Sequence, residues 1–408
     1  MNCRHCKAKL SNVFADLQNS PPSNSFLTKN QLDEVESYFP LKIYSCDMCY
    51  LVQVDEYKSA HEIFDDAYLY FSSFSKSWLA HSKNYCDQMV ERFGINSSNR
   101  VVEIASNDGY LLQYFNEKNI PVLGVEPTAN TAAVAQGKGI ETLVKYFGVA
   151  TAQEMVVNNQ KANLLLGNNV LAHVPDINDF VGGMKLVLAD DGVITMEFPH
   201  LYQLVKYNQF DTIYHEHFSY LSFTTVSKIF AAVGLQMFDV EELPTHGGSL
   251  RIYAKHESNQ THQITENVVK LLEKERAAGM TSKSYYQGFQ EACDTVKIDF
   301  LNFLIDANKA NKKIAGYGAA AKGNTLLNFC GVKKDLISYV VDANPHKQNK
   351  FLPGSHIPVV DESVLKADKP DYVIIFPWNL KEEIVEQLSY VREWGGKFVI
   401  PIPSIQIT

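Results

Sequence analysis

Long apolar runs are missing from this 408-residue chain. No window approaches the roughly 18 uncharged apolar residues that a membrane-spanning helix requires. The first ten residues, MNCRHCKAKL, place no apolar stretch behind their basic side chains, as a secretion signal would. Both absences argue against membrane insertion and export, so we expect a cytoplasmic protein with no membrane partner.

Positive charge is also scarce. The chain holds 37 Lys and Arg against 46 Asp and Glu, a net charge of −9. A surface that follows nucleic-acid phosphates would need the opposite balance, so we expect no nucleic acid as partner, although a local basic pocket for a nucleotide diphosphate remains compatible with this charge. At 46% hydrophobic and 20% charged residues the composition is that of a folded protein, and the length predicts more than one domain.

Cysteine is sparse but patterned. Four of the seven cysteines form two CxxC pairs, Cys3 with Cys6 and Cys46 with Cys49. This spacing puts two thiolates on each of two tight turns, which suits one tetrahedral zinc ion with a structural role. The gap between the pairs is longer than in common zinc ribbons, so the intervening segment must form an excursion of its own. Unliganded structural or redox cysteines remain the alternative.

From Arg100 onward, short β-type runs alternate with helical periodicity, as in RVVEIA, GYLLQYF, PVLGVEP, NTAAVAQ and ANLLLGNNV. This alternation predicts a doubly wound parallel sheet. The pattern starts again at KKIAGYGAAAKGNTLLNF and continues through ISYVVDA, DYVIIFP and GKFVIPIP, which predicts a second, smaller parallel sheet. The fold class is therefore α/β.

The first predicted β-loop-helix unit, VVEIASNDGYLL, lacks the GxGxxG pattern that admits a pyrophosphate. Asp108 would repel phosphate in this loop, whereas Gly109 lets the backbone approach a ligand closely. Glu126 ends the next strand, where an acid commonly binds ribose hydroxyls. The loop favours S-adenosylmethionine (SAM) over a nicotinamide dinucleotide, and a purely structural turn is the alternative.

Two histidine segments follow. GNNVLAHVPD places His173 just beyond a strand, where a lone histidine is more often a satisfied partner of a backbone carbonyl. YHEHF concentrates Tyr214, His215, Glu216 and His217. An extended backbone would put both histidines on one face, whereas a turn would relax that rule. A neutral imidazole beside a carboxylate is suited to general-base chemistry, while metal binding and a surface turn are weaker alternatives.

Together with YLYFSSFSKSW (68–78), THGGSLR (245–251) and GYGAAAKGNTLLN (316–328), these motifs resemble the deoxysugar C-methyltransferase family over nearly the full chain. Members methylate C-3 of dTDP-linked keto-deoxysugars. The resemblance implies a zinc-binding domain (1–66), a class I SAM methyltransferase domain (67–258) and a smaller Rossmann-like C-terminal domain with leading helices (259–408). It further implies a nucleotide-sugar substrate and no obligate protein partner.

The resemblance and the motifs together define the expected site. His217 aligns with the family's general base, and the supporting catalytic residues are Tyr214, Glu216, His173 and Tyr68. We expect SAM to contact Glu103, Ala105, Asn107, Asp108, Gly109, Glu126, Pro127, Asn168 and Asn169, and the substrate to contact Tyr70, Arg251, Gly318 and Lys322. The alternatives are a SAM-dependent O- or N-methyltransferase and a non-catalytic zinc-ribbon protein.

Overall fold

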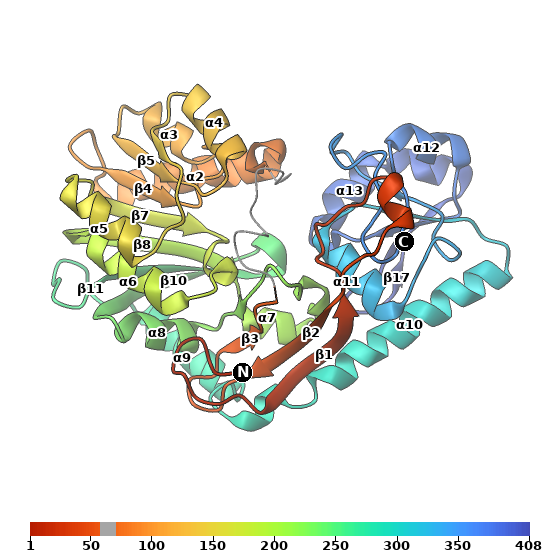
Figure 1. The fold of residues 1–408 in the computed structure, drawn as a ribbon, viewed down its shortest axis with the longest axis horizontal. Helices are drawn as coiled ribbons and strands as arrows, with labels where there is room; N and C mark the ends of the chain where they lie inside the picture. Colours follow the sequence, from red (N-terminus) through yellow and green to blue (C-terminus); the bar gives the residue numbers. More distant parts are fainter. Residues whose placement is uncertain (58–70) are drawn as a thin grey trace.

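The computed structural model describes residues 1–57 and 71–408, and within these residues the strands form three sheets (Figure 1). The central sheet has the order β10-β11-β8-β7-β4-β5-β6, and β11 is antiparallel to both of its neighbours. Its strands are β4 (Val101–Ile104), β5 (Val122–Val125), β6 (Thr142–Leu143), β7 (Ala162–Asn168), β8 (Leu188–Pro199), β10 (Leu235–Leu243) and β11 (Ser249–His256).

Helices cover both faces of the central sheet (Figure 1), and the apolar strand sequences explain why. Successive side chains of a strand point to opposite faces, so an apolar run buries both. Val101 belongs to the core under α2 (Lys76–Phe93) and α3 (Leu112–Asn116), whereas Val102 belongs to the core under α5, α6 and α8. The parallel sheet that the alternating pattern predicts is thereby present.

The C-terminal sheet has the order β14-β13-β12-β15-β16-β17, parallel except for its last strand. Its strands are β12 (Ile314–Tyr317), β13 (Val340–Val341), β14 (Val359–Val360), β15 (Tyr372–Ile375), β16 (Lys397–Ile400) and β17 (Gln406–Ile407). The chain order reverses between β12 and β15, and ligands of open α/β sheets bind at such a switch point. The second parallel sheet predicted from sequence is therefore present as well.

The third sheet contains the two cysteine turns, and a strand from far along the chain completes it. Its order is β1-β2-β3-β9, all antiparallel: β1 (Asn12–Ser20), β2 (Phe39–Ser45), β3 (Val52–Val54) and β9 (Ser219–Tyr220). Because β9 directly follows the YHEHF segment, the sheet that carries the cysteines also fixes that segment.

The excursion expected between the two CxxC pairs reaches the C-terminal domain (Figure 1). Leu27 bridges to Phe351, and the Asn324 side-chain amide donates to the Ser23 carbonyl over 2.6 Å. Glu36 accepts a hydrogen bond from the Gly354 amide at 2.8 Å. The N-terminal segment therefore contacts both of the larger domains.

The remaining helices are α4 (Ala129–Gly137), α5 (Val149–Val157), α6 (Ile177–Val187), α7 (Leu201–Lys206), α8 (Phe223–Ala231), α9 (Glu266–Ala277), α10 (Phe289–Lys309), α11 (Ala321–Cys330), α12 (Glu362–Asp368) and α13 (Lys381–Gln387). The long α10 runs from the base of the molecule to the C-terminal domain (Figure 1). None of the helices in the described residues has the length and hydropathy needed to cross a membrane.

Candidate active site

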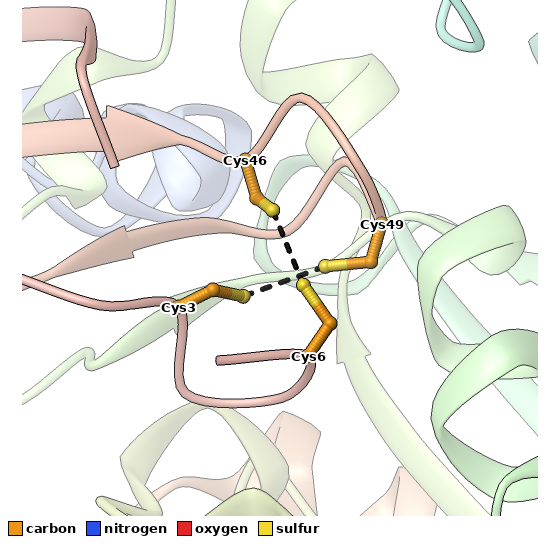
Figure 2. A group of neighbouring side chains, drawn as sticks. All are labelled: Cys3, Cys6, Cys46 and Cys49. Atoms are coloured by element: carbon orange, nitrogen blue, oxygen red, sulfur yellow. Dashed lines mark hydrogen bonds between the residues drawn. The ribbon is translucent and has the colours of Figure 1, made fainter. Parts of the chain in front are cut away.

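The four predicted zinc ligands converge. Their Sγ atoms all lie within 4.8 Å of one another, and the side chains point toward a common centre (Figure 2). The sulfurs of Cys3 and Cys49 are 3.5 Å apart, as are those of Cys6 and Cys46. The Met48 amide donates to Cys46 Sγ and the Gln53 side chain to Cys3 Sγ, both at 3.4 Å. Four thiolates with N–H donors around them fit a closed, structural zinc site.

The loop after β4 is held in an unusual backbone conformation. Ala105 (φ 57°), Asn107 (φ 48°) and Gly109 (φ 74°) all have positive φ. A Cβ on Gly109 would lie 2.4 Å from Ile140 Cδ1, so contact within the protein itself requires glycine there. The Glu126 carboxylate accepts hydrogen bonds from the backbone amides of Asn107 at 2.9 Å and Thr128 at 3.0 Å. The predicted acid therefore also fixes the shape of the loop.

Several buried polar atoms along this edge have no hydrogen-bond partner among the described residues: Ser106 Oγ, Asp108 Oδ1, Asn169 Oδ1 and both polar side-chain atoms of Asn168. Leaving such an atom unsatisfied costs about 1–3 kcal/mol. Their position beyond β4 and β7, beside Glu126, fits a ligand that offers ribose hydroxyls and amino and carboxylate groups, as SAM does.

Two other predicted cofactor residues differ in setting. Glu103 is fully buried within β4, and burial raises the pKa of its carboxyl well above the ordinary value, against a lowering hydrogen bond with Tyr110. Pro127 lies between β5 and α4 and is partly exposed. Glu103 is therefore enclosed within the sheet, whereas Pro127 lies at its partly exposed edge.

The predicted catalytic residues come together beside this edge. The His173 and His217 rings lie 4.6 Å apart, nearly perpendicular at 69°. Tyr214 Oη is 2.8 Å from His217 Nε2, and His217 Nδ1 is 2.9 Å from the Thr212 carbonyl. His173 Nδ1 lies 2.8 Å from the Glu216 carbonyl. Because a carbonyl only accepts, both Nδ1 atoms donate, and Nε2 of each neutral ring carries the lone pair.

Burial dominates the electrostatics of the cluster. It lowers the pKa of His217 well below the ordinary value, and neighbouring His173 lowers it further. Burial likewise lowers the pKa of His173 to about 4. Both imidazoles are therefore neutral near pH 7, the form in which Nε2 can accept a proton.

The other members of YHEHF face elsewhere because residues 214–217 form a turn rather than a strand. His215 Nε2 lies 3.3 Å from the Pro40 carbonyl, and its ring packs against Phe39 of β2. The Glu216 carboxylate accepts a hydrogen bond from Asn24 at 3.1 Å. Of the two backbones that the sequence left open, the structure has the turn, so the alternation of an extended strand does not apply to the two histidines.

Trp378, a residue that the sequence motifs did not single out, joins the C-terminal domain to the segment before this cluster. The Trp378 indole N–H donates to Asp211 Oδ2 over 2.7 Å, and Lys322 Nζ lies 4.2 Å from the Trp378 ring centroid. Burial raises the pKa of Asp211 to about 6, an effect that Lys322 opposes. Burial lowers the pKa of Lys322 to about 8. The predicted substrate residue Lys322 thus lies at the junction of the two domains.

His246 is a further residue of this junction. Its φ of 54° is followed by positive φ at Gly247 and Gly248, and its Nε2 accepts a hydrogen bond from the Asn169 amide at 2.9 Å. Burial lowers its pKa to about 4, and Lys322 lowers it further. The sequence signal that could have indicated His246 is the pair of glycines that follows it in THGGSLR. Glycine pairs allow consecutive positive φ values, and such strained turns gather at functional sites.

The remaining predicted substrate residues are less clearly placed. Arg251 is only 3% exposed, and its guanidinium pairs with Glu197 at 2.7 Å and Glu241 at 3.0 Å. Gly318 has a φ of 87° and packs on Pro377. Tyr68 and Tyr70 lie outside the described residues. A substrate phosphate would have to compete for Arg251 with carboxylates that already neutralise it.

Comparison with known proteins finds family models that match three stretches of the chain and one similar C-methyltransferase. Residues 3–64 match a zinc binding domain, residues 78–240 a methyltransferase domain, and residues 244–403 a C-methyltransferase C-terminal domain. The C-methyltransferase NovU of Streptomyces niveus is 34% identical over 372 residues, which cover 91% of this chain and 88% of NovU.

Solved structures give weaker likenesses, restricted to part of the chain. A SAM-dependent methyltransferase from Clostridium acetobutylicum is 9% identical with a TM-score of 0.35, covering 44% of this chain and 92% of its own. Magnesium protoporphyrin IX methyltransferase from Synechocystis, with bound SAM, is 12% identical with a TM-score of 0.34, covering 48% of this chain and 88% of its own.

The strand order of the central sheet, its one reversed strand and the matched methyltransferase domain define a class I SAM-dependent methyltransferase with a zinc-binding domain. Within that class, the chain belongs to the C-methyltransferase family of NovU. SAM and zinc are its cofactors, as the loop and the CxxC pairs predicted.

Proposed function

We propose that this C-methyltransferase methylates C-3 of a nucleotide-linked keto-deoxysugar, with a dTDP carrier, and that His217 is its general base. The observation that carries the proposal is the cluster of His217, Tyr214 and His173 beside the cofactor loop. SAM, when bound, supplies an electrophilic methyl group. A sugar carbon becomes nucleophilic toward it only after losing a proton, so a C-methyltransferase needs a base, and this cluster contains one.

The hydrogen bonds identify the basic atom. His217 Nδ1 donates to the Thr212 carbonyl, so the proton from carbon goes to Nε2. In the structure that lone pair faces the Tyr214 hydroxyl, 2.8 Å away. Substrate must therefore displace Tyr214 from Nε2, which frees the hydroxyl to donate elsewhere.

A ketone next to the reacting carbon makes the step feasible, because the charge left by the proton moves onto the carbonyl oxygen as an enolate. Hydrogen-bond donors at that oxygen stabilise the charge. Tyr214 suits this role better than His173. The single proton of neutral His173 is already donated to the Glu216 carbonyl, whereas the Tyr214 proton is released when the substrate displaces it.

The carrier is assigned to the junction with the C-terminal domain. Lys322 lies there, at the start of α11 beyond the Gly318 turn, and its ammonium faces Asn379 Oδ1 at 2.8 Å. A diphosphate would be attracted to this charge and would keep Lys322 protonated near pH 7. The C-3 position and the dTDP carrier come from the family resemblance, and the sugar assay described next tests both.

The test combines methyl transfer with a separate measurement of proton removal. Purified protein with methyl-labelled SAM and a panel of dTDP-4-keto-deoxysugars should add one methyl group, located at C-3 by mass spectrometry and NMR. Without SAM, the same sugars in D2O should exchange the C-3 hydrogen. A well-placed base contributes about 10²–10⁴-fold, so His217→Asn should lose both reactions by that factor.

His217→Asn is a matched substitution because the asparagine amide can still donate to the Thr212 carbonyl while the basic nitrogen is lost. SAM affinity, measured by calorimetry, should remain that of the wild type. Methyl transfer that persists in the variant would exclude His217 as the base. SAM binding without transfer to any sugar nucleotide would overturn the substrate assignment.

A further inference from the structure

The zinc-binding turn carries a side chain that leaves the metal site and contacts the segments that follow His173 and His217. Arg4 lies between the ligands Cys3 and Cys6. Its backbone amide donates to Gln53 Oε1 at 2.8 Å, and the side-chain amide of the same Gln53 donates to Cys3 Sγ at 3.4 Å. The backbone of Arg4 is therefore fixed by the hydrogen bonds that surround the thiolates.

The Arg4 guanidinium joins two segments that are otherwise distant in sequence. Nη1 donates to the Pro175 carbonyl at 2.8 Å, and Nη2 donates to the Val54 carbonyl at 2.5 Å. Its central carbon lies 4.9 Å from the Phe218 ring centroid, a cation–π distance. Val54 in turn donates its amide to the Phe218 carbonyl at 3.2 Å.

These contacts fall next to the two histidines of the cluster. Pro175 is two residues after His173, and Phe218 immediately follows His217. A second link runs parallel to the first: the Asn178 side chain donates to the His5 carbonyl at 2.9 Å, and its Oδ1 lies 2.8 Å from His5 Nδ1. The zinc turn thus holds the His173 segment through two consecutive residues.

The distance between the histidine rings depends on this arrangement. His217 Nδ1 is bonded to the Thr212 carbonyl of its own segment, whereas His173 Nδ1 is bonded to the Glu216 carbonyl of the neighbouring segment, so a displacement of either segment would change the contact between the rings. We propose that Arg4 is a positioning residue of the reaction: the zinc turn presents its guanidinium so that the His173 and His217 segments keep their relative position. The inference rests on the proposed role of His217. It gives the zinc domain a part in orienting the base in addition to its part in folding.

Arginine is suited to this task because its planar fork donates in two directions while its face stacks on an aromatic ring. Lysine keeps the charge, but its single ammonium nitrogen cannot bond to both the Pro175 and the Val54 carbonyls. Glutamine keeps one donor nitrogen but loses the charge and the contact with the Phe218 ring. Arg4→Gln and Arg4→Lys therefore form a graded pair, and Lys9→Gln, an exposed position in the same turn region, is the control for a charge change.

The first readout needs no substrate. In protein with ¹⁵N-labelled histidine, the imidazole signals assigned to His173 and His217 should shift or broaden in Arg4→Gln and, to a smaller extent, in Arg4→Lys. They should stay unchanged in Lys9→Gln. Zinc content should remain one per chain and SAM affinity that of the wild type, since neither set of ligands is altered.

The second readout is C-3 hydrogen exchange and methyl transfer. A displacement of about 1 Å at a reacting group can cost about 10²-fold. We expect Arg4→Gln to lower kcat 10- to 100-fold with little change in KM, and Arg4→Lys to recover part of the loss. Unchanged imidazole signals with full activity would overturn the inference, as would loss of zinc in both Arg4 variants, because Arg4 would then only maintain the metal site. If no sugar is methylated, the NMR comparison still decides the question.

Discussion

Burial is the main cause of the lowered pKa values of His217 and His246, and the charge of one lysine adds to it. Lys322 lowers the pKa of both His217 and His246, since its positive charge opposes a second one on either ring. A general base works in its unprotonated form, which exists above its pKa. In the wild type, the acid limb of kcat/KM should therefore lie below pH 6.5, the ordinary histidine value.

Replacing Lys322 should shift the acid limb of the pH dependence of kcat/KM in a defined direction. Lys322→Gln removes the repulsion, so the pKa values of His217 and His246 should rise, and the acid limb should move to higher pH. Histidine NMR titration of the free protein measures the first effect, and a pH–rate profile measures the second. Lys334→Gln, at an exposed site in the same domain, should change neither. A titration that stays in place in Lys322→Gln would contradict the electrostatic coupling.

The motifs predicted the residues that stand close together in sequence and missed those that only the fold unites. Tyr214 and His217 are three residues apart, and the YHEHF pattern sufficed to select them. Asp211 lies only three residues before Tyr214, but nothing near it or near Trp378 indicates that the Trp378 indole would donate to its buried carboxylate from 167 positions away. Conversely, Arg251 sits in a conspicuous motif, yet two carboxylates hold it inside the protein.

In the loop between β4 and α3, Gly109 is needed both for its backbone conformation and for the close packing around it. Gly109 has positive φ and also faces Ile140 and Ala135, whereas Gly139, with a similar φ of 78°, has no atom within 4 Å of an added Cβ. Gly139→Ala should cost about 1 kcal/mol of unfolding free energy through backbone strain alone. Gly109→Ala should cost about 1–3 kcal/mol more, because overpacking adds to the strain.

Urea unfolding of the two variants measures this difference directly. Gly109→Ala should also weaken SAM binding, since moving the loop displaces Asn107 and Asp108, while Gly139→Ala should leave it unchanged. Equal unfolding free energies would mean that the loop relaxes away from Ile140 at no cost.

The longer strands were predictable from the sequence, and the shortest ones were not. β7 reads ANLLLGN, and its apolar run correctly indicated a strand of the parallel sheet, which the structure buries on both faces. β9 has two residues, too few to show any periodicity, yet it ties the YHEHF segment to the cysteine-bearing sheet. The sequence pattern accordingly suggested a zinc module and a catalytic segment but not their connection.

Across the whole molecule, the carboxyl edges of the two parallel sheets meet. η5 (Thr245–Gly247) follows β10 at the edge of the central sheet, and η7 (Trp378–Leu380) lies just beyond β15 of the C-terminal sheet. A Cβ on Gly247 would lie 2.4 Å from the Trp378 ring, so the two edges are in direct contact. Each edge is where its own sheet would bind a ligand. Lys322 stacks on Trp378 at this contact and is close enough to His217 to lower its pKa.

Trp378 should therefore couple domain contact to catalysis. Trp378→Phe keeps an aromatic ring but removes the N–H bonded to Asp211, a residue of η4 (Phe210–Thr212), whose Thr212 carbonyl anchors His217. Trp394→Phe is matched, because its indole N–H donates to the Pro370 carbonyl at 3.0 Å within the C-terminal domain. Each change should cost about 1–3 kcal/mol of unfolding free energy. Only Trp378→Phe should lower kcat, by about tenfold or more, because only its partner borders the base. Equal activity in the two variants would show that the contact between the sheets stabilises the protein without orienting His217.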